Sequence, residues 1–363
     1  MVDEERQPDR RHISRRDFVK GTSQAAVMTL GLGALGQQSS VFRTGRPRVV
    51  RAHDRAATSW DYRSDYYFDF IDQAVVDRMF QKALQALMGV SSTLKACHLL
   101  LPTYRSGDRI AIKINVNNHA DQSNQIDATA PVLNAVLRSL IDQMGVPAVD
   151  VYVYDVSRTI PWFRIRNRVP WNVTYVQSGD SLAQMDHNAP IHFRNIPTQY
   201  CPYVLSQADH LIDLCLFKDH QYVLATMGMK NHFGTTRPSP ANLHSPIHPN
   251  ISDLNATPHI RHKTRLIVGD ALFAIYTGGP YGQPQQWTTF PGGPTPNSIF
   301  LGLDPVATES VMIDYLIAEQ VYRGIPLLSH DYLHDAMSTY GLGWHEHRDA
   351  TGQYRIIDYV ELG

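Results

Sequence analysis

Hydrophobic and polar residues alternate from Arg109 to Val116, and this period of two predicts a strand. The isoleucines at 110, 112 and 114 share one face, whereas Lys113 and Asn115 share the other face near the carboxyl end. An apolar stripe at helical spacing follows over residues 132–144, and a second strand is predicted over residues 151–154. A strand, a helix and a strand in this order predict a parallel pair with a right-handed crossover.

The remaining hydrophobic pattern extends this unit into a larger α/β fold. Further strands are predicted near residues 48–50 and over residues 211–217, 266–268 and 298–303, and further helices over residues 70–88 and from Pro305 to about Val321. Thr129 and Asp304 are the predicted N-caps of two helices. Residues 156–205 are predicted to be an insertion or edge region, and residues 219–262 and 276–297 to be long loops. We therefore predict an α/β fold with a mostly parallel central sheet flanked by helices, with long loop insertions.

The N-terminal segment predicts export. The residues from Ser14 to Lys20 are similar to the twin-arginine export motif, and a short apolar stretch rich in Ala and Gly follows up to Gly36. This stretch is too short to cross a membrane comfortably. We expect residues 1–36 to be a signal peptide read by the twin-arginine translocase. Residues 37–363 are then expected to form a single α/β domain, periplasmic or extracellular, with no membrane span.

Composition excludes several classes of partner and cofactor. The 363 residues carry a formal net charge of −1, so no basic surface for nucleic acid is expected. The three cysteines, Cys97, Cys201 and Cys215, form no Cys-x-x-Cys pair, so no iron–sulfur cluster is expected and no disulfide is predicted. The sequence has no Walker loop, no Gly-x-Gly-x-x-Gly after a strand and no Gly-x-Ser-x-Gly elbow. Nucleotide-dependent kinases, Rossmann dehydrogenases and serine hydrolases are therefore disfavoured.

Lysines at predicted strand ends form the first candidate site. Lys113 and Lys218 fall at such ends, and Lys230 follows Lys218 by a dozen residues. Ligands of open α/β sheets bind outside the carboxyl ends of the strands, so these lysines are expected to bind a small anion together with Asn115 and Asn231. The alternative is that each lysine is solvated or paired within the protein, with Asp155 and Asp270 as the internal partners.

Histidines form the second candidate site. His220, His244 and His248 lie in one stretch, and His345 and His347 alternate in the tail, so a transition metal is possible at either place. No metal-binding motif such as His-Glu-x-x-His occurs, so hydrogen-bonded structural histidines and a polar surface turn are the alternatives.

Three further residues are candidates for proton transfer. His232, Asp253 and Asp270 are predicted to be catalytic, because imidazole and carboxylate groups are the usual general acids and bases. An aspartate near a strand end is also a common turn former, which is the structural alternative for Asp270.

The motifs taken together resemble a known family. Lys113-x-Asn115, Lys218-x-His220, the residues from Met229 to Gly234 and Asp304-Pro305-Val306-Ala307 resemble the domain of unknown function 362 family, over about residues 109–321. The resemblance implies the fold and the candidate positions but no reaction. Its exported branch often carries a twin-arginine signal, and other members carry ferredoxin-type cysteine clusters that this chain lacks. We expect an exported enzyme that acts on a small anionic substrate with metal assistance; a periplasmic ligand-binding or cofactor-carrying protein and a structural or accessory protein are the alternatives.

Overall fold

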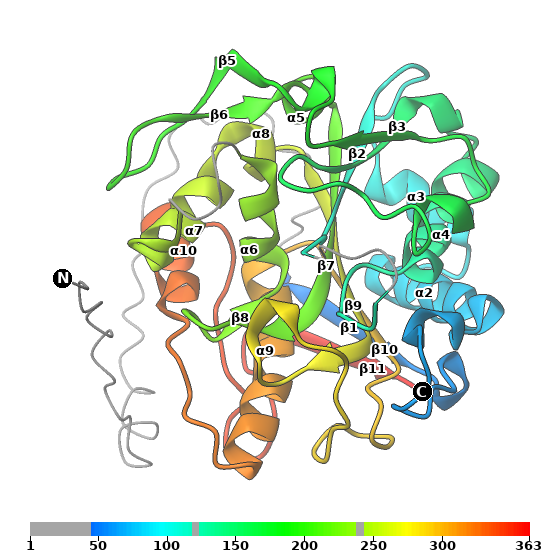
Figure 1. Ribbon diagram of the computed structural model, residues 1–363, viewed down its shortest axis with the longest axis vertical. Coiled ribbons are helices and arrows are strands. Elements are labelled where there is room, and N and C mark those ends of the chain that lie inside the picture. Colours follow the sequence, from blue (N-terminus) through cyan, green and yellow to red (C-terminus); the bar gives the residue numbers. More distant parts are fainter. Residues whose placement is uncertain (1–44, 118–122, 237–242) are drawn as a thin grey trace.

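A computed structural model of the protein describes residues 45–117, 123–236 and 243–363. In these residues nine strands form one sheet with the order β11-β1-β10-β9-β7-β2-β3-β4, and β8 pairs with β7 (Figure 1). The strands are β1 (Arg48–His53), β2 (Ile110–Ile114), β3 (Val151–Asp155), β4 (Thr174–Gln177), β7 (His210–Asp219), β8 (Ala225–Thr226), β9 (Thr264–Ile275), β10 (Ser298–Gly302) and β11 (Asp358–Leu362). The predicted signal segment, residues 1–36, lies outside the described residues.

The pairing of the strands confirms the predicted mostly parallel sheet. Strands β9, β7, β2, β3 and β4 run parallel to one another, and β10 is antiparallel to both β9 and β1. The predicted crossover pair is β2 and β3, and β2 also lies beside β7 with Lys113 opposite Asp213. Strands β2 and β7 are therefore neighbours, but their ends are not side by side. The last residue of β2, Ile114, lies opposite Leu214, and Lys218 comes later along β7.

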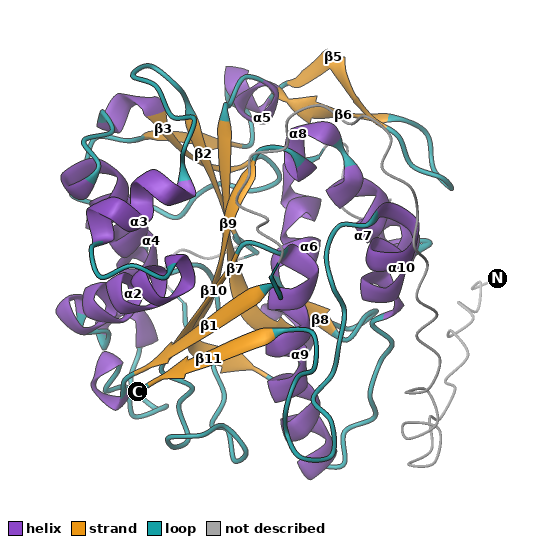
Figure 2. Ribbon diagram, turned by 180° about the vertical axis from the view of Figure 1, so that it is seen from behind, coloured by secondary structure: helices purple, strands orange, loops and turns teal. Residues whose placement is uncertain are grey.

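Helices cover both faces of the sheet (Figure 2). One layer contains α2 (Gln73–Met88), α3 (Thr93–Leu100) and α4 (Ala130–Arg138), and the other contains α6 (Gly228–Asn231), α7 (Ile247–Ala256), α8 (Pro258–Arg261), α9 (Pro305–Tyr322) and α10 (Asp331–Tyr340). Alternate residues of the strands pack into the two cores: Ile112 and Leu214 face the first layer, and Ala111 and Cys215 face the second. By the same alternation, Lys113 and Asp213 face the second layer.

A separate element lies at one end of the molecule. The antiparallel pair β5 (Met185–Ile191) and β6 (Gln199–Pro202) and the short α5 (Tyr203–Ser206) belong to the segment predicted as an insertion, and β4 is the outermost strand of the main sheet. The prediction of an insertion or edge region over residues 156–205 is confirmed.

The helix ends follow the local chemistry of the sequence with one exception. Asp304 accepts a hydrogen bond from the amide of Ala307 and caps α9, and Gly89 ends α2 with φ +66°. Thr129 occupies the N-cap position of α4, but the prediction that its side chain caps the helix is wrong. Its hydroxyl instead donates to Asp270 at 2.8 Å, because β9 brings a buried carboxylate against that end of α4.

Two predictions of secondary structure are wrong, and two elements of the tail were not predicted. Residues 219–262 are not a long loop, since they form β8 and the helices α6, α7 and α8. Asp270 does not end a strand, because β9 continues to Ile275. The tail, for which no element was predicted, forms α10 and β11.

The predicted absence of a membrane span agrees with the helices that the structure describes, none of which is long and apolar enough to cross a bilayer. Cys97, Cys201 and Cys215 are buried free thiols.

Candidate functional site

Lys113 is held by a complete set of internal partners. Its ammonium is fully buried and donates to the carbonyl of Ile114 at 2.6 Å, to Asp155 at 3.0 Å and to the side-chain oxygen of Asn231 at 3.2 Å. An ammonium has three protons to donate, so none is left for a ligand. The internal pairing with Asp155, the alternative drawn from the sequence, is therefore what the structure shows for Lys113.

Asn231 connects the second helical layer to the sheet. Its side-chain nitrogen donates to Asp213 at 2.6 Å and to the carbonyl of Leu214 at 3.2 Å, and its oxygen accepts from Asn115 at 3.1 Å as well as from Lys113. The side chain thus ties α6 to both β2 and β7. Asn231 therefore positions the site, whereas the side-chain oxygen of Asn115 is buried and the structure shows no hydrogen-bond partner for it.

Gly234 is required where the chain leaves α6. A Cβ at this position would lie 2.5 Å from Oδ2 of Asp155 and 2.8 Å from Nζ of Lys113. These distances are shorter than any van der Waals contact, so only glycine lets the backbone approach the buried ion pair. The carbonyl of Gly234 also accepts from the amide of Val156 at 3.0 Å, which fixes this turn against the end of β3.

His232 is a neutral imidazole in the same buried cluster. Burial and, after it, the charge of Lys113 lower the pKa of His232 to about 3. Its Nδ1 lies 3.3 Å from the hydroxyl of Thr235, and its Nε2 lies 4.0 Å from Oδ2 of Asp213. The ring therefore stands between a hydroxyl and a carboxylate, an arrangement that suits proton transfer once a substrate is present.

Lys218 and Lys230 differ from Lys113 in lacking such partners. Lys218 is fully buried, and the structure shows no hydrogen-bond partner for its ammonium. Burial lowers the pKa of Lys218 to about 8, although the charges of Asp127 and Asp219 oppose the shift. Burial and then the charge of Lys218 lower the pKa of Lys230 to about 7. The two ammonium groups repel each other in a region of low dielectric, which is the electrostatic setting of an anion site.

An aromatic group lies beside Lys230. Its ammonium lies 4.6 Å from the centre of the Phe233 ring, and that ring packs edge-on against His244 at 5.2 Å between centroids. His220 stacks on His244 at 5.3 Å with an interplanar angle of 10°. The Nδ1 of His220 accepts from the amide of Tyr222 at 3.1 Å. His244 thus contacts the aromatic ring that lies beside Lys230, and His220 stacks on His244 with a nearly parallel ring plane.

Two acidic residues of this region were not among the candidates predicted from the sequence. Glu309 on α9 accepts from the amide of Met229 at 2.6 Å and from the hydroxyl of Tyr332, and its charge opposes the lowered pKa of Lys230. Burial raises the pKa of both Asp213 and Glu309 to about 7. Asp213 stands between apolar residues of β7, and a carboxylate that burial forces to have a polar partner is the signal that could have found it. Glu309 lies among other polar residues of α9 and has no such signal.

Other predicted residues lie in separate sets of contacts. Asp253 is bound by Arg194, with Nε at 2.7 Å, and by the hydroxyl of Tyr340 at 2.6 Å. Asp270 accepts from the hydroxyl of Thr129 and from the amide of Leu272, and burial raises the pKa of Asp270 to about 6.

The predicted metal ligands also lie in separate groups. His248 stacks on Tyr332 at 6.0 Å, away from the stacked pair His220 and His244. His345 and His347 lie together in the tail, where His330 joins them.

A family model matches residues 110–314, more than half of the chain, and describes a Domain of unknown function, DUF362. The chain belongs to the DUF362 family. The match covers Lys113, Lys218, Lys230 and Glu309, and it ends before the tail histidines. No curated protein matches the chain significantly. The matched residues thus include the lysine cluster, but the family description names no activity, and the chemistry must be argued from the residues.

Proposed function

We propose that this DUF362 protein binds a small anion, bearing a phosphate or carboxylate group, at Lys218 and Lys230. The fully buried ammonium of Lys218, for which the structure shows no hydrogen-bond partner, carries this proposal. An unpaired charge in the protein interior costs several kcal/mol, and a second ammonium nearby adds to that cost. A bound anion would offset both charges through charge-assisted hydrogen bonds.

We further propose that the bound anion is a substrate rather than cargo. Lys230 has a pKa of about 7, so it can accept and release a proton near neutral pH. His232 and Asp213 lie in the same cluster, within 4.0 Å of each other. Catalysis needs groups that transfer protons, whereas binding a ligand does not. These residues therefore favour an enzyme over a binding protein.

The location follows from the N-terminal motif. The resemblance of Ser14 to Lys20 to a twin-arginine signal supports export of the folded protein by the twin-arginine translocase, to the periplasm or beyond. The substrate would then be a small anion available in that compartment, and metal assistance to the reaction is part of the same proposal.

A thermal-shift titration tests the anion site. Wild-type protein is titrated with phosphate, sulfate and small carboxylates at constant ionic strength, and at least one of them is expected to raise Tm saturably. Lys218→Met and Lys230→Met are expected to abolish this response. The control is Lys263→Met, because Lys263 is a half-buried lysine outside the cluster, and its ammonium donates to the carbonyls of Leu205 and Ser206. An unchanged response in Lys218→Met, or no response of the wild type to any of these anions, would refute the site.

A further inference from the structure

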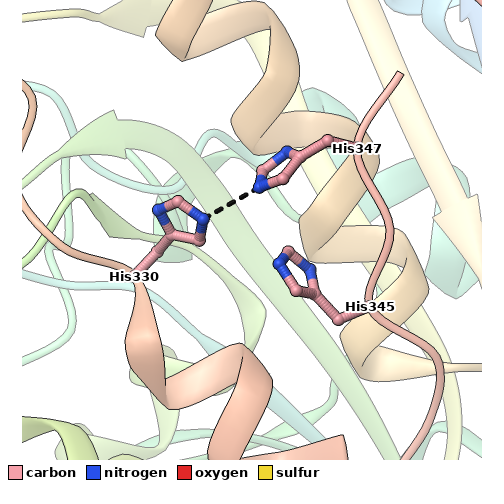
Figure 3. A group of neighbouring side chains, drawn as sticks. All are labelled: His330, His345 and His347. Atoms are coloured by element: carbon pink, nitrogen blue, oxygen red, sulfur yellow. Dashed lines mark hydrogen bonds between the residues drawn. The ribbon is translucent and has the colours of Figure 1, made fainter. Parts of the chain in front are cut away.

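Three histidines from the C-terminal part of the chain converge on one point (Figure 3). His330 directly precedes α10, and His345 and His347 lie in the segment that follows this helix. One ring nitrogen of each lies within 4.8 Å of the others. Nε2 of His330 and Nε2 of His347 are 2.9 Å apart. All three residues lie outside the part of the chain that the family model matches.

The hydrogen bond at the back of His347 fixes which of its nitrogens carries the proton. Nδ1 of His347 lies 2.5 Å from Oδ1 of Asp314. The other oxygen of Asp314 accepts from the amide of Arg348 and the hydroxyl of Tyr354. A carboxylate held in this way accepts the Nδ1 proton, so Nε2 of His347 presents a lone pair to the point where the rings meet.

Hydrogen bonds also determine which ring nitrogen of His345 carries the proton. The hydroxyl of Ser310 donates its one proton to the carbonyl of Val306 at 2.7 Å, so it must accept from Nδ1 of His345 at 2.8 Å. Nε2 of His345 therefore also carries a lone pair. This atom is buried, and the structure shows no hydrogen-bond partner for it. A buried acceptor without a donor costs about 1–3 kcal/mol, so some group that accepts a lone pair is expected there.

His330 completes the cluster. Since Nε2 of His347 has no proton, the 2.9 Å contact requires Nε2 of His330 to donate in the metal-free protein. Nδ1 of His330 is buried and has no hydrogen-bond partner in the structure. A metal ion at Nε2 of His330 would take the place of this proton, which would move to Nδ1 of the same ring and leave the imidazole neutral.

We propose that Nε2 of His330, His345 and His347 bind one divalent late transition-metal ion, with zinc as the best-fitting class. Three neutral imidazoles are a known ligand set for catalytic zinc, and they leave a fourth position for water or an anion. Two nitrogens bound to tetrahedral zinc lie about 3.4 Å apart. Nε2 of His330 and Nε2 of His347 are 2.9 Å apart, so their separation needs to increase only slightly. Asp314 and Ser310 accept the Nδ1 protons of His347 and His345, and such acceptors orient the imidazole ligands of metal ions.

The burial of the rings supports this assignment. Burial, followed by the neighbouring histidines, lowers the pKa of His330 to about 4 and the pKa of His345 to about 2. Burial of the rings favours the uncharged imidazole, the form that binds metals. The predicted alternative, His220 with His244, has its two rings stacked with nearly parallel planes, so their in-plane lone pairs do not point at a common ion.

Calorimetric titration of the full chain with Zn²⁺ tests the site. The protein is purified without a histidine tag, treated with a chelator and titrated, and one ion per chain is expected. His347→Ala and His345→Asn are expected to lose this binding. Asn retains a nitrogen that can donate to Ser310 in place of Nδ1, so His345→Asn removes the ligand atom and keeps the internal hydrogen bond. Ser310→Ala is expected to weaken binding about 10-fold.

His248→Ala is the matched control, because His248 is a partly buried histidine that stacks on Tyr332. It is expected to bind Zn²⁺ as the wild type does. Circular dichroism of each metal-free variant checks that the fold is retained, and Co²⁺ provides a visible spectrum for the ligand geometry. Wild-type protein without stoichiometric Zn²⁺ binding, or folded His345→Asn and His347→Ala variants that bind with wild-type affinity, would overturn the proposal. Either result leaves the anion site standing, since that site is tested through other residues and another ligand.

Discussion

Replacing Lys218 by methionine is expected to stabilise the ligand-free protein. Methionine has nearly the length of lysine and needs no hydrogen-bond partner, whereas the buried ammonium has none in the structure. Burial lowers the pKa of Lys218 from 10.5 to about 8. Each pKa unit corresponds to about 1.4 kcal/mol, so the ammonium reduces the free energy of unfolding by about 3 kcal/mol at about pH 6.5.

The pH dependence identifies the charge as the cause. The folded pKa lies below the unfolded one, so the cost is fully present below pH 8 and disappears as the pH rises towards 10.5. At about pH 9.5 about 1 kcal/mol of the cost remains. The stability advantage of Lys218→Met over the wild type should therefore shrink by about 2 kcal/mol between these two pH values.

Urea denaturation of both proteins at the two pH values measures this difference directly. Lys263→Met is again the control and should be destabilised, since its ammonium donates to two carbonyl groups. Saturating concentrations of the bound anion should reverse the order and make the wild type the more stable protein at the lower pH. A Lys218→Met protein that is less stable than the wild type without ligand, or an advantage that does not change with pH, would refute the reasoning.

Four further predictions concern other parts of the chain. Lys113→Ala should lower the free energy of unfolding by about 3–5 kcal/mol in urea, because it leaves a buried carboxylate unpaired. Gly234→Ala should lower Tm and weaken the anion response, since its Cβ would lie 2.5 Å from a carboxylate oxygen. Gly302→Ala would place a Cβ 2.0 Å from a hydroxyl in the first turn of α9, so it should weaken both anion and Zn²⁺ binding in the two titrations. Replacing Arg15 and Arg16 by Lys should leave precursor in the cytoplasm on immunoblots of cell fractions, and normal export would contradict the signal assignment.

Much of the fold could be predicted because its signals are local. Alternation over residues 109–116 gives β2 with Lys113 on the face that meets the second helical layer, and Asp304 with Pro305 marks the start of α9. Helix α7 was missed because its pattern is weak. Its first turn contains Pro249, which a helix accepts at that place but not further along. Apolar residues at 247, 251 and 254 have helical spacing, but the prolines and asparagines around them obscure this pattern.

The candidate site was only partly predictable, because its contacts join distant segments. The position of Lys113 at a strand end is local, but its pairing with Asp155 depends on β3 lying beside β2. Glu309 resembles any helical glutamate in the sequence, and it becomes a member of the site only because α9 packs against α6. His330 lies 15 positions before His345, and only the packing of α10 brings the two rings together.

Helix α9 is the element on which both proposed sites depend. Glu309 faces the lysine cluster and binds the amide of Met229, while the next residue, Ser310, holds the ring of His345, and Asp314 holds His347 one turn later. Glu309 also accepts from the hydroxyl of Tyr332, which stands two residues after His330 and so fixes the start of α10. A shift of α9 would therefore change the lysine cluster and the histidine cluster together. Because α9 is buried along most of its length, such a shift would need a change in its packing against β10. While this packing is kept, α9 holds the lysine cluster and the histidine cluster at a fixed distance from each other.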